Sequence, residues 1–302
     1  MWFLFALLTA LAWGAADLFY KKGSDSNDKL THLKIVIMVG FVMGIHALGY
    51  MLYNGINFDP FDMVRYLPVS ALYILSMVFG YIGLRYLMLS VSSPIQNSSG
   101  AITAILLLIF FPQSLGTFHY VGMILITIGV IGIAIVEKQV DDKLLKASGT
   151  VIDRKYRLGV IAIIFPILYA VLDSLGTFAD GIYLDEMQLI SEDAALLAYE
   201  FTFFICAVIA FIYVKFIKKD NYNVLTDGTR LSAAIFETAG QFFYVFAMAD
   251  HAVVAAPLVA SYCIFSVIFS RIFLKEKLSA KHYFVIIIVI IGIITMGIAD
   301  EL

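Results

Sequence analysis

Apolar runs of about 20 residues recur along the whole chain, each bounded by charged or turn-forming residues. A run of this length is what one helix needs to cross the hydrocarbon core of a bilayer. Hydrophobic residues make up 62% of the sequence and charged residues only 14%, against roughly a quarter charged in soluble domains. The sequence therefore predicts an all-α integral membrane protein with ten transmembrane helices, at about residues 2–20, 35–53, 66–87, 94–111, 119–136, 158–180, 194–214, 231–250, 254–274 and 281–299.

Basic residues fall almost entirely on alternate loops of this arrangement. Of the 20 Lys and Arg residues, only Arg65 lies outside the loops that follow the first, third, fifth, seventh and ninth spans. The opposite loops carry acidic pairs such as Asp185–Glu186. By the positive-inside rule, the basic loops face the cytoplasm and both termini face out. We expect the cell membrane as the location.

The sequence contains an internal repeat. A shift of 163 positions aligns identical residues, namely Tyr81 with Tyr244, Pro94 with Pro257, Gly129 with Gly292, and His119–Tyr120 with His282–Tyr283. A shift of 156 positions aligns Trp13 with Tyr169 and Asp17 with Asp173. These matches predict two five-helix units, residues 1–137 and 158–302, joined by a cytoplasmic linker loop at 138–157.

An odd number of spans in each unit has a geometric consequence. The second unit must enter the membrane from the side opposite to the first, which gives inverted-topology repeats. Inverted repeats are typical of proteins that alternate access to a central site.

Several short motifs resemble those of one transporter family. They are Trp13–Gly14, Pro257, the segment Leu-Lys-Glu-Lys-Leu at 274–278, and Gly292. Together with ten spans and the repeat, they resemble the EamA-type members of the drug/metabolite transporter superfamily. The resemblance implies two inverted five-helix repeats, a central cavity and transport of small metabolites without ATP hydrolysis. The chain departs from the family pattern at Lys275, where a glycine is usual, and at Gln113, where the first repeat lacks the glutamate.

Two aspartates inside spans follow an aromatic residue by four positions. They are Asp17 after Trp13 and Asp173 after Tyr169, and each pair lies on one helix face. A carboxylate at this depth costs about 3 kcal/mol on insertion scales. Lys21 could pair with Asp17, whereas Asp173 has no basic residue nearby in sequence, so it needs a partner on another helix, water or a proton. The alternative is a structural role, in which each carboxylate reaches the membrane interface or accepts hydrogen bonds from neighbouring helices.

Two glutamates are also expected inside spans. Glu200 follows Tyr199, and Glu237 begins a polar stripe with Gln241 and Tyr244 at helical spacing. No Lys or Arg lies in the centre of any span. This excess of negative charge predicts a bound cation or exchangeable protons.

Aromatic residues accompany the acids. The rings of Trp13, Tyr169, Tyr199, Tyr244 and Tyr262 suit an ammonium group by cation–π contact, although packing or interfacial anchoring explains many aromatic residues equally well. Gln96 and Asn97 follow Pro94 within a span. They predict either a broken helix that lines the site or hydrogen bonds between helices.

Other function classes find little support. The histidines have no metal-ligand spacing, and phosphate-binding loops and nucleophile elbows are absent. We therefore expect no enzymatic activity, no cofactor, no metal and no nucleic-acid partner; the partners expected are a small-molecule substrate and the lipid bilayer, with a homodimer left open.

The sequence predicts a secondary transporter that works by alternating access, with an amine-bearing or cationic substrate or with proton coupling. An exporter of neutral metabolites or amino acids, in which the acids are structural, is one alternative. A membrane sensor or an intramembrane enzyme is another, although neither an output domain nor a catalytic constellation is visible.

Overall fold

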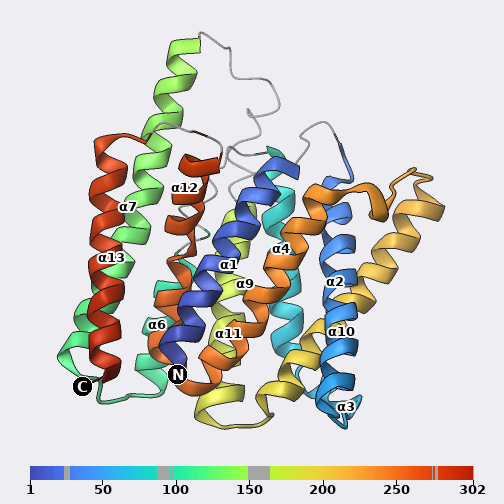
Figure 1. The fold of residues 1–302 in the computed structure, drawn as a ribbon, viewed down its shortest axis with the longest axis horizontal. Helices are drawn as coiled ribbons and strands as arrows, with labels where there is room; N and C mark the ends of the chain where they lie inside the picture. The colour runs from blue at the N-terminus through green and yellow to red at the C-terminus, as the bar shows by residue number, and fades with distance from the viewer. Residues whose placement is uncertain are drawn as a thin grey trace.

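A bundle of long helices forms the whole described part of the chain in the computed structural model (Figure 1). The structure describes residues 1–23, 28–86, 96, 98–148, 164–273, 275 and 278–301. The helices are α1 (Trp2–Gly23), α2 (Thr31–Asn54), α3 (Phe61–Arg65), α4 (Leu67–Tyr86), α6 (Ser99–Phe110), α7 (Thr117–Ser148), α9 (Ile164–Gly181), η2 (Ile182–Glu186), α10 (Glu192–Ile212), η3 (Tyr213–Ile217), η4 (Val224–Thr226), α11 (Gly228–Ala260), α12 (Tyr262–Phe273) and α13 (Ala280–Glu301).

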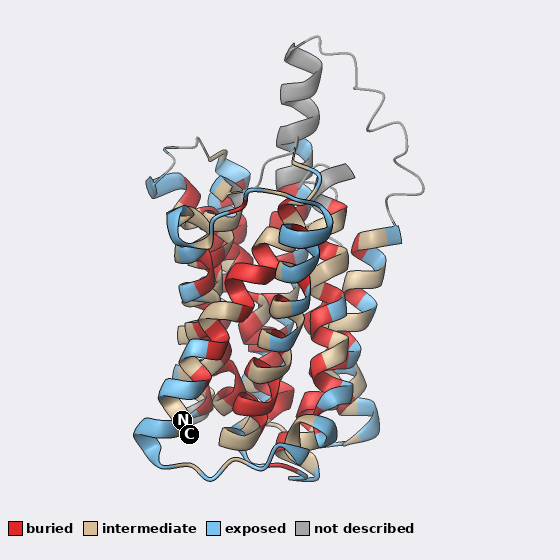
Figure 2. Cartoon of the chain, turned by 90° about the vertical axis from the view of Figure 1, so that its right-hand side faces the viewer, coloured by how far each residue is buried: buried red, intermediate tan, exposed pale blue. Residues whose placement is uncertain are grey.

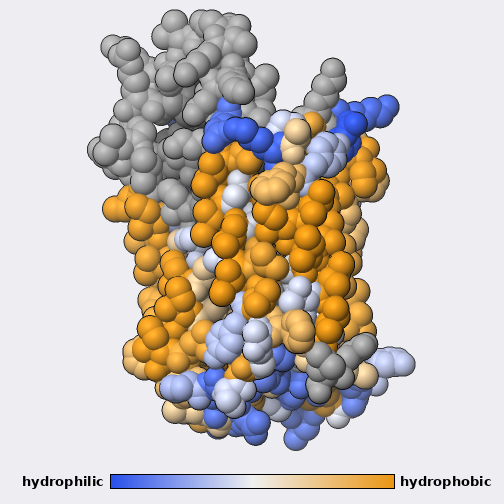
Figure 3. Space-filling model, turned by 90° about the vertical axis from the view of Figure 1, so that its left-hand side faces the viewer, coloured by the Kyte–Doolittle hydropathy of each residue, from blue (hydrophilic) through white to orange (hydrophobic). Residues whose placement is uncertain are grey.

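The outer surface of the bundle is suited to lipid. Seven segments of the described chain are long and apolar enough to cross a membrane, and two shorter apolar helices begin at Leu67 and Ser99. On α7, Ile124, Ile128 and Ile131 are exposed while Ile126 and Val130 face inward, so the helix is apolar all round, as spanning helices are. Figure 3 shows the apolar belt between two hydrophilic ends, and Figure 2 shows the buried residues facing the bundle interior.

The helices of each half of the chain pack mainly against helices of the other half. Helix α1 packs against α11 and α12, and α9 packs against the corresponding helices of the first half, α4 and α6. Helix α2 packs against α10, and α7 packs against α13. The core therefore consists of contacts between the halves, and α1, α4, α6, α9, α11 and α12 surround its centre.

Glycines allow the closest of these contacts. A Cβ atom on Gly40 would lie 2.6 Å from the carbonyl oxygen of Phe203, and one on Gly44 would lie 2.5 Å from the ring of Phe204. The Gly40–Gly44 spacing is therefore a close-packing motif between α2 and α10. Gly122 and Gly292 play the same part where α7 meets α13.

Some helix boundaries differ from those expected. Helix α7 continues to Ser148, which carries the helix well into the polar segment expected to be a loop. Helix α11 runs on to Ala260 with a kink at His251, close to the expected turn. A second break at Ser261 divides the expected span 254–274; there the backbone N–H and the hydroxyl group of Ser261 both donate to the carbonyl of Leu258.

A methyl group at Gly40 should destabilise the protein. Alanine normally favours a helix over glycine by about 1 kcal/mol, but here the methyl group meets the α10 backbone, and overpacking of this kind costs about 1–3 kcal/mol. We expect Gly40→Ala to lower the unfolding temperature in detergent. Gly49→Ala on the same helix is the control, because nothing lies within 4 Å of that position. Equal unfolding temperatures for the two variants would contradict this account of the α2–α10 contact.

Candidate functional site

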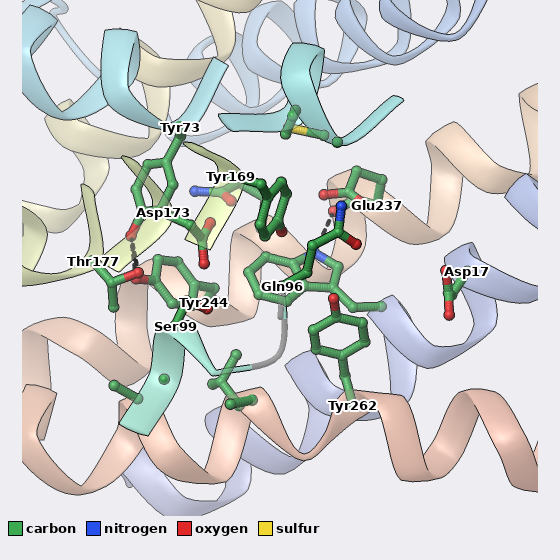
Figure 4. Close-up of a pocket in the computed structure, with 18 of the residues that line it drawn as sticks. Asp17, Tyr73, Gln96, Ser99, Tyr169, Asp173, Thr177, Glu237, Tyr244 and Tyr262 are labelled. Atoms are coloured by element: carbon green, nitrogen blue, oxygen red, sulfur yellow. Dashed lines mark hydrogen bonds between the residues drawn. The ribbon is translucent and has the colours of Figure 1, made fainter. Parts of the chain in front are cut away.

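A cavity lies at the centre of the bundle, where α1, α4, α6, α9, α11 and α12 meet (Figure 4). The centre of a water molecule can occupy a volume of about 160 Å³ inside it. Ten of the twelve residues predicted from sequence line it: Trp13, Asp17, Gln96, Tyr169, Asp173, Tyr199, Glu237, Gln241, Tyr244 and Tyr262. The helical spacing of the polar stripes explains this convergence, since each stripe faces inward.

The other two predicted residues are not part of this cavity lining. Asn97 lies outside the described residues. Glu200 is fully buried between α10 and α2, where His46 Nδ1 lies 2.9 and 2.8 Å from its two carboxylate oxygens. This partner could not be predicted from the sequence, because residues 46 and 200 lie on helices far apart along the chain.

Three carboxylates face the cavity. The Ser266 hydroxyl donates to Asp17 Oδ2 at 2.6 Å, and the Asp173 carboxylate interacts with Ser99 and Ser76. In the view of Figure 4, Asp173 and Glu237 lie on either side of Tyr169. Among the described lining residues there is no Lys, Arg or His, and the side chain of Lys21 lies outside the described part. The described lining is therefore acidic, without a basic counterpart.

Aromatic rings form one wall of the cavity. Trp13 stacks on Tyr244 with ring centroids 5.2 Å apart, and Tyr262 meets Trp13 edge-on at 6.1 Å. The Trp13 indole N–H donates to the backbone carbonyl of Glu237 at 3.3 Å, which fixes the ring. A Cβ atom at position 240 would lie 2.3 Å from Trp13, so glycine is needed there for the indole to reach the cavity.

Tyr169, the counterpart of Trp13 in the second half, is seated in a similar way. A Cβ atom on Gly80 of α4 would lie 2.8 Å from its ring. Each half therefore places an aromatic ring from its first helix over a glycine of the other half.

A layer of hydroxyl groups borders the cavity on the side of Tyr73 and Tyr244. The two phenol oxygens are 2.5 Å apart, and Tyr73 Oη donates to Thr177 Oγ1 at 3.1 Å. Beyond them the Tyr66 hydroxyl donates to the buried carboxylate of Asp180. Sequence reasoning found Tyr244 but missed Tyr66, Tyr73, Thr177 and Asp180, although Asp173, Thr177 and Asp180 have the spacing of one helix face. Asp180 was placed at the end of a span, where a charge needs no partner.

This arrangement can neutralise a positive charge. Carboxylates supply Coulomb attraction, and the faces of Trp13 and the tyrosines attract an ammonium group through their π systems. Among the described residues, no group of three or more His, Cys, Asp and Glu side chains is arranged to hold a metal ion. The donors suit an organic cation or protons.

Comparison with known proteins places the chain in a family context. The sequence model of the EamA-like transporter family matches residues 1–135 and again residues 158–298. A solved structure titled "Crystal structure of protein" has a TM-score of 0.68 and 11% identity over 98% of both chains, which shows a shared fold. No curated protein matches in sequence.

The His46–Glu200 pair should stabilise the fold. His46→Ala would leave the buried Glu200 carboxylate without its partner, and breaking a buried pair from one side costs about 3–5 kcal/mol. Because His46 is one-third exposed, we expect the lower end of that range. Glu200→Gln keeps a hydrogen-bonding group and should cost less.

The unfolding temperatures of the two single variants and the double variant measure the coupling between the residues. Adding Glu200→Gln to His46→Ala should recover stability, because the unpaired charge is removed. A double variant in which the two losses simply add would contradict the pairing.

Proposed function

Because the chain belongs to the EamA-like transporter family, it is an integral membrane transporter, and we propose that it carries small cationic metabolites bearing an amine or quaternary ammonium group. The observation behind this proposal is the negative, aromatic-lined cavity, whose described lining contains no basic side chain. A substrate ammonium would offset the cost of the buried carboxylates, and the carboxylates would select against anions.

We assign the residues of the cavity different parts in binding. Asp173 and Glu237 attract the charge of the substrate, and Trp13, Tyr244 and Tyr262 present aromatic surface to it. Gln96 and Gln241 can accept or donate hydrogen bonds to other polar groups of the substrate. Asp17 already accepts a hydrogen bond from Ser266, which supports a structural share in its role.

Ten spans in two inverted repeats are the topology we propose. The segment Gly228–Phe273 has 46 residues, enough for two crossings, and the shorter helices α4 and α6 supply further spans. Helices α6 and α12 begin and end at positions exactly 163 residues apart, Ser99 with Tyr262 and Phe110 with Phe273, the shift of the sequence repeat. The first helix of each half packs against corresponding helices of the other half, α1 on α11 and α12, and α9 on α4 and α6. A pseudo-twofold axis in the membrane produces this pattern.

Alternating access is the mechanism we propose for this architecture. The hydroxyl layer of Tyr73, Tyr244 and Thr177 separates the cavity from the end of the bundle where Tyr66 and α3 lie, which is also the end of both termini (Figure 1). We assign this end to the outer face of the cell membrane, since the basic loops lie at the other end. Movement of one repeat against the other would break this layer and open the cavity outward.

Organic cations should stabilise the purified protein. A ligand at 100 times its dissociation constant adds about 2.7 kcal/mol to the free energy of unfolding, so tetramethylammonium and butylammonium should raise the unfolding temperature. Acetate at the same ionic strength should not. Asp173→Asn and Glu237→Gln should each reduce the shift, whereas Asp62→Asn at the exposed Asp62–Arg65 pair should not.

The contrary outcome favours the alternative function. If the cation-induced shift is the same in Asp173→Asn, Glu237→Gln and the wild-type protein, the acids are structural and the substrate is recognised by other groups. Neutral metabolites would then be the substrates to screen.

The proposed orientation can be tested by cysteine labelling. In a background with Cys206 and Cys263 replaced by alanine, a membrane-impermeant maleimide should label Asp59→Cys in intact cells. It should label Lys218→Cys only after the membrane is permeabilised, because the positive-inside rule places that loop in the cytoplasm. The reverse labelling pattern would overturn the orientation.

A further inference from the structure

Asp180 is a buried acid outside the cavity lining. Its side chain has no exposed surface. One carboxylate oxygen, Oδ1, accepts a hydrogen bond from the Tyr66 hydroxyl. The other, Oδ2, is buried and has no hydrogen-bond partner among the described residues. An ionised carboxylate with an unpartnered oxygen is costly in an apolar bundle, so this position suits a carboxyl group that carries a proton.

The groups that face Asp180 are phenols. Tyr66 approaches it from the junction of α3 and α4, Tyr73 from α4 and Tyr244 from α11, while Tyr183 of η2 packs edge-on against the ring of Tyr66. Phenols are uncharged at neutral pH. No cationic side chain is among the groups found to interact with Asp180 in the described structure. The carboxyl group therefore loses its charge by binding a proton and not by pairing with one of these groups.

Hydroxyl groups link this acid to the cavity. Asp173, Thr177 and Asp180 lie on one face of α9, and seven residues of helix span about 10 Å. Between the two acids, Thr177, Tyr73 and Tyr244 are joined by hydrogen bonds. Hydroxyl groups joined in this way can pass a proton from one to the next.

We propose that Asp180 is the binding site of the coupling proton, separate from the carboxylates that bind the substrate cation. This inference rests on the proposed function as a cation transporter. A hydronium ion gives up a proton, leaving water, and the proton forms an O–H bond at Oδ2 of Asp180, which makes the carboxyl group neutral and allows it to stay buried. When this O–H bond breaks, the proton returns to water and the charge left on Asp180 favours opening of the hydroxyl layer toward the outer end. No electron transfer is involved.

The separation of the two sites gives a clear experimental signature. In proteoliposomes, exchange of radiolabelled tetramethylammonium at equal pH requires the cavity carboxylates, whereas accumulation against a gradient requires the proton site. If one proton is exchanged for each cation, a gradient of one pH unit supports about tenfold accumulation. We expect Asp180→Asn to retain wild-type exchange and to lose accumulation, so that the inside and outside concentrations become equal. Asp180→Glu should recover part of the accumulation, and Asp62→Asn should behave as wild type.

Infrared spectroscopy tests the proton on Asp180 without any substrate. The carbonyl stretch of a protonated carboxyl group should be lost from the spectrum of Asp180→Asn, and Tyr66→Phe should shift it, because its hydrogen bond is removed. Both variants should keep the stabilisation by tetramethylammonium, which shows that they fold.

The outcomes separate this inference from the proposed function. Loss of exchange together with accumulation in Asp180→Asn would overturn a separate proton site, and so would full accumulation or an unchanged infrared spectrum. Absence of tetramethylammonium exchange in the wild-type protein would count against the proposed substrate class, and the infrared measurement would still decide the state of Asp180.

Discussion

Buried negative charge is the constraint on which the rest of the structure depends. Asp173 and Glu237 face a cavity inside an apolar bundle, and the described lining offers them no basic partner. At about 3 kcal/mol for each acid on insertion scales, such a site is sustained only if cations, protons or hydroxyl groups compensate it. The aromatic wall, the hydroxyl layer and the glycines that admit Trp13 and Tyr169 can all be understood as parts of that compensation. The outer surface, by contrast, meets only the demands of lipid.

The two copies of the repeat share the arrangement of their helices but differ in the acids that they place in and near the cavity. Trp13 and Tyr169 occupy corresponding places over glycines of the opposite half, and Asp17 and Asp173 follow them by one helical turn. The copies then diverge. Asp17 accepts a hydrogen bond from Ser266, whereas the second half adds Glu237 and Asp180 on α11 and α9, the helices that carry Tyr244 and Thr177 of the hydroxyl layer. A symmetric scaffold of this kind can exchange two conformations while an asymmetric set of charged groups decides what is carried.

Sequence reasoning reached the helical class and the family, which the comparison confirmed, and ten of the twelve site residues that it named line the cavity. It succeeded because hydropathy and charge sort strongly in a membrane protein and because polar stripes must face inward. It did not reach the His46–Glu200 pair or the Tyr66–Asp180 bond, since each joins helices distant in sequence and depends on how they pack. Helix ends were also less accurate: nothing in the polar segment after residue 137 indicated that α7 continues to Ser148, and the break at Ser261 depends on a local hydroxyl bond.

We propose that charge, more than shape, selects the molecule that occupies the cavity. Calorimetric titration of the purified wild-type protein with tetramethylammonium and with tert-butyl alcohol, an uncharged molecule of similar size, tests it most directly. We expect tetramethylammonium to bind and the alcohol to bind far more weakly, because only the cation compensates the charge of the carboxylates. Equal affinity for the two molecules, or binding of the alcohol alone, would contradict it.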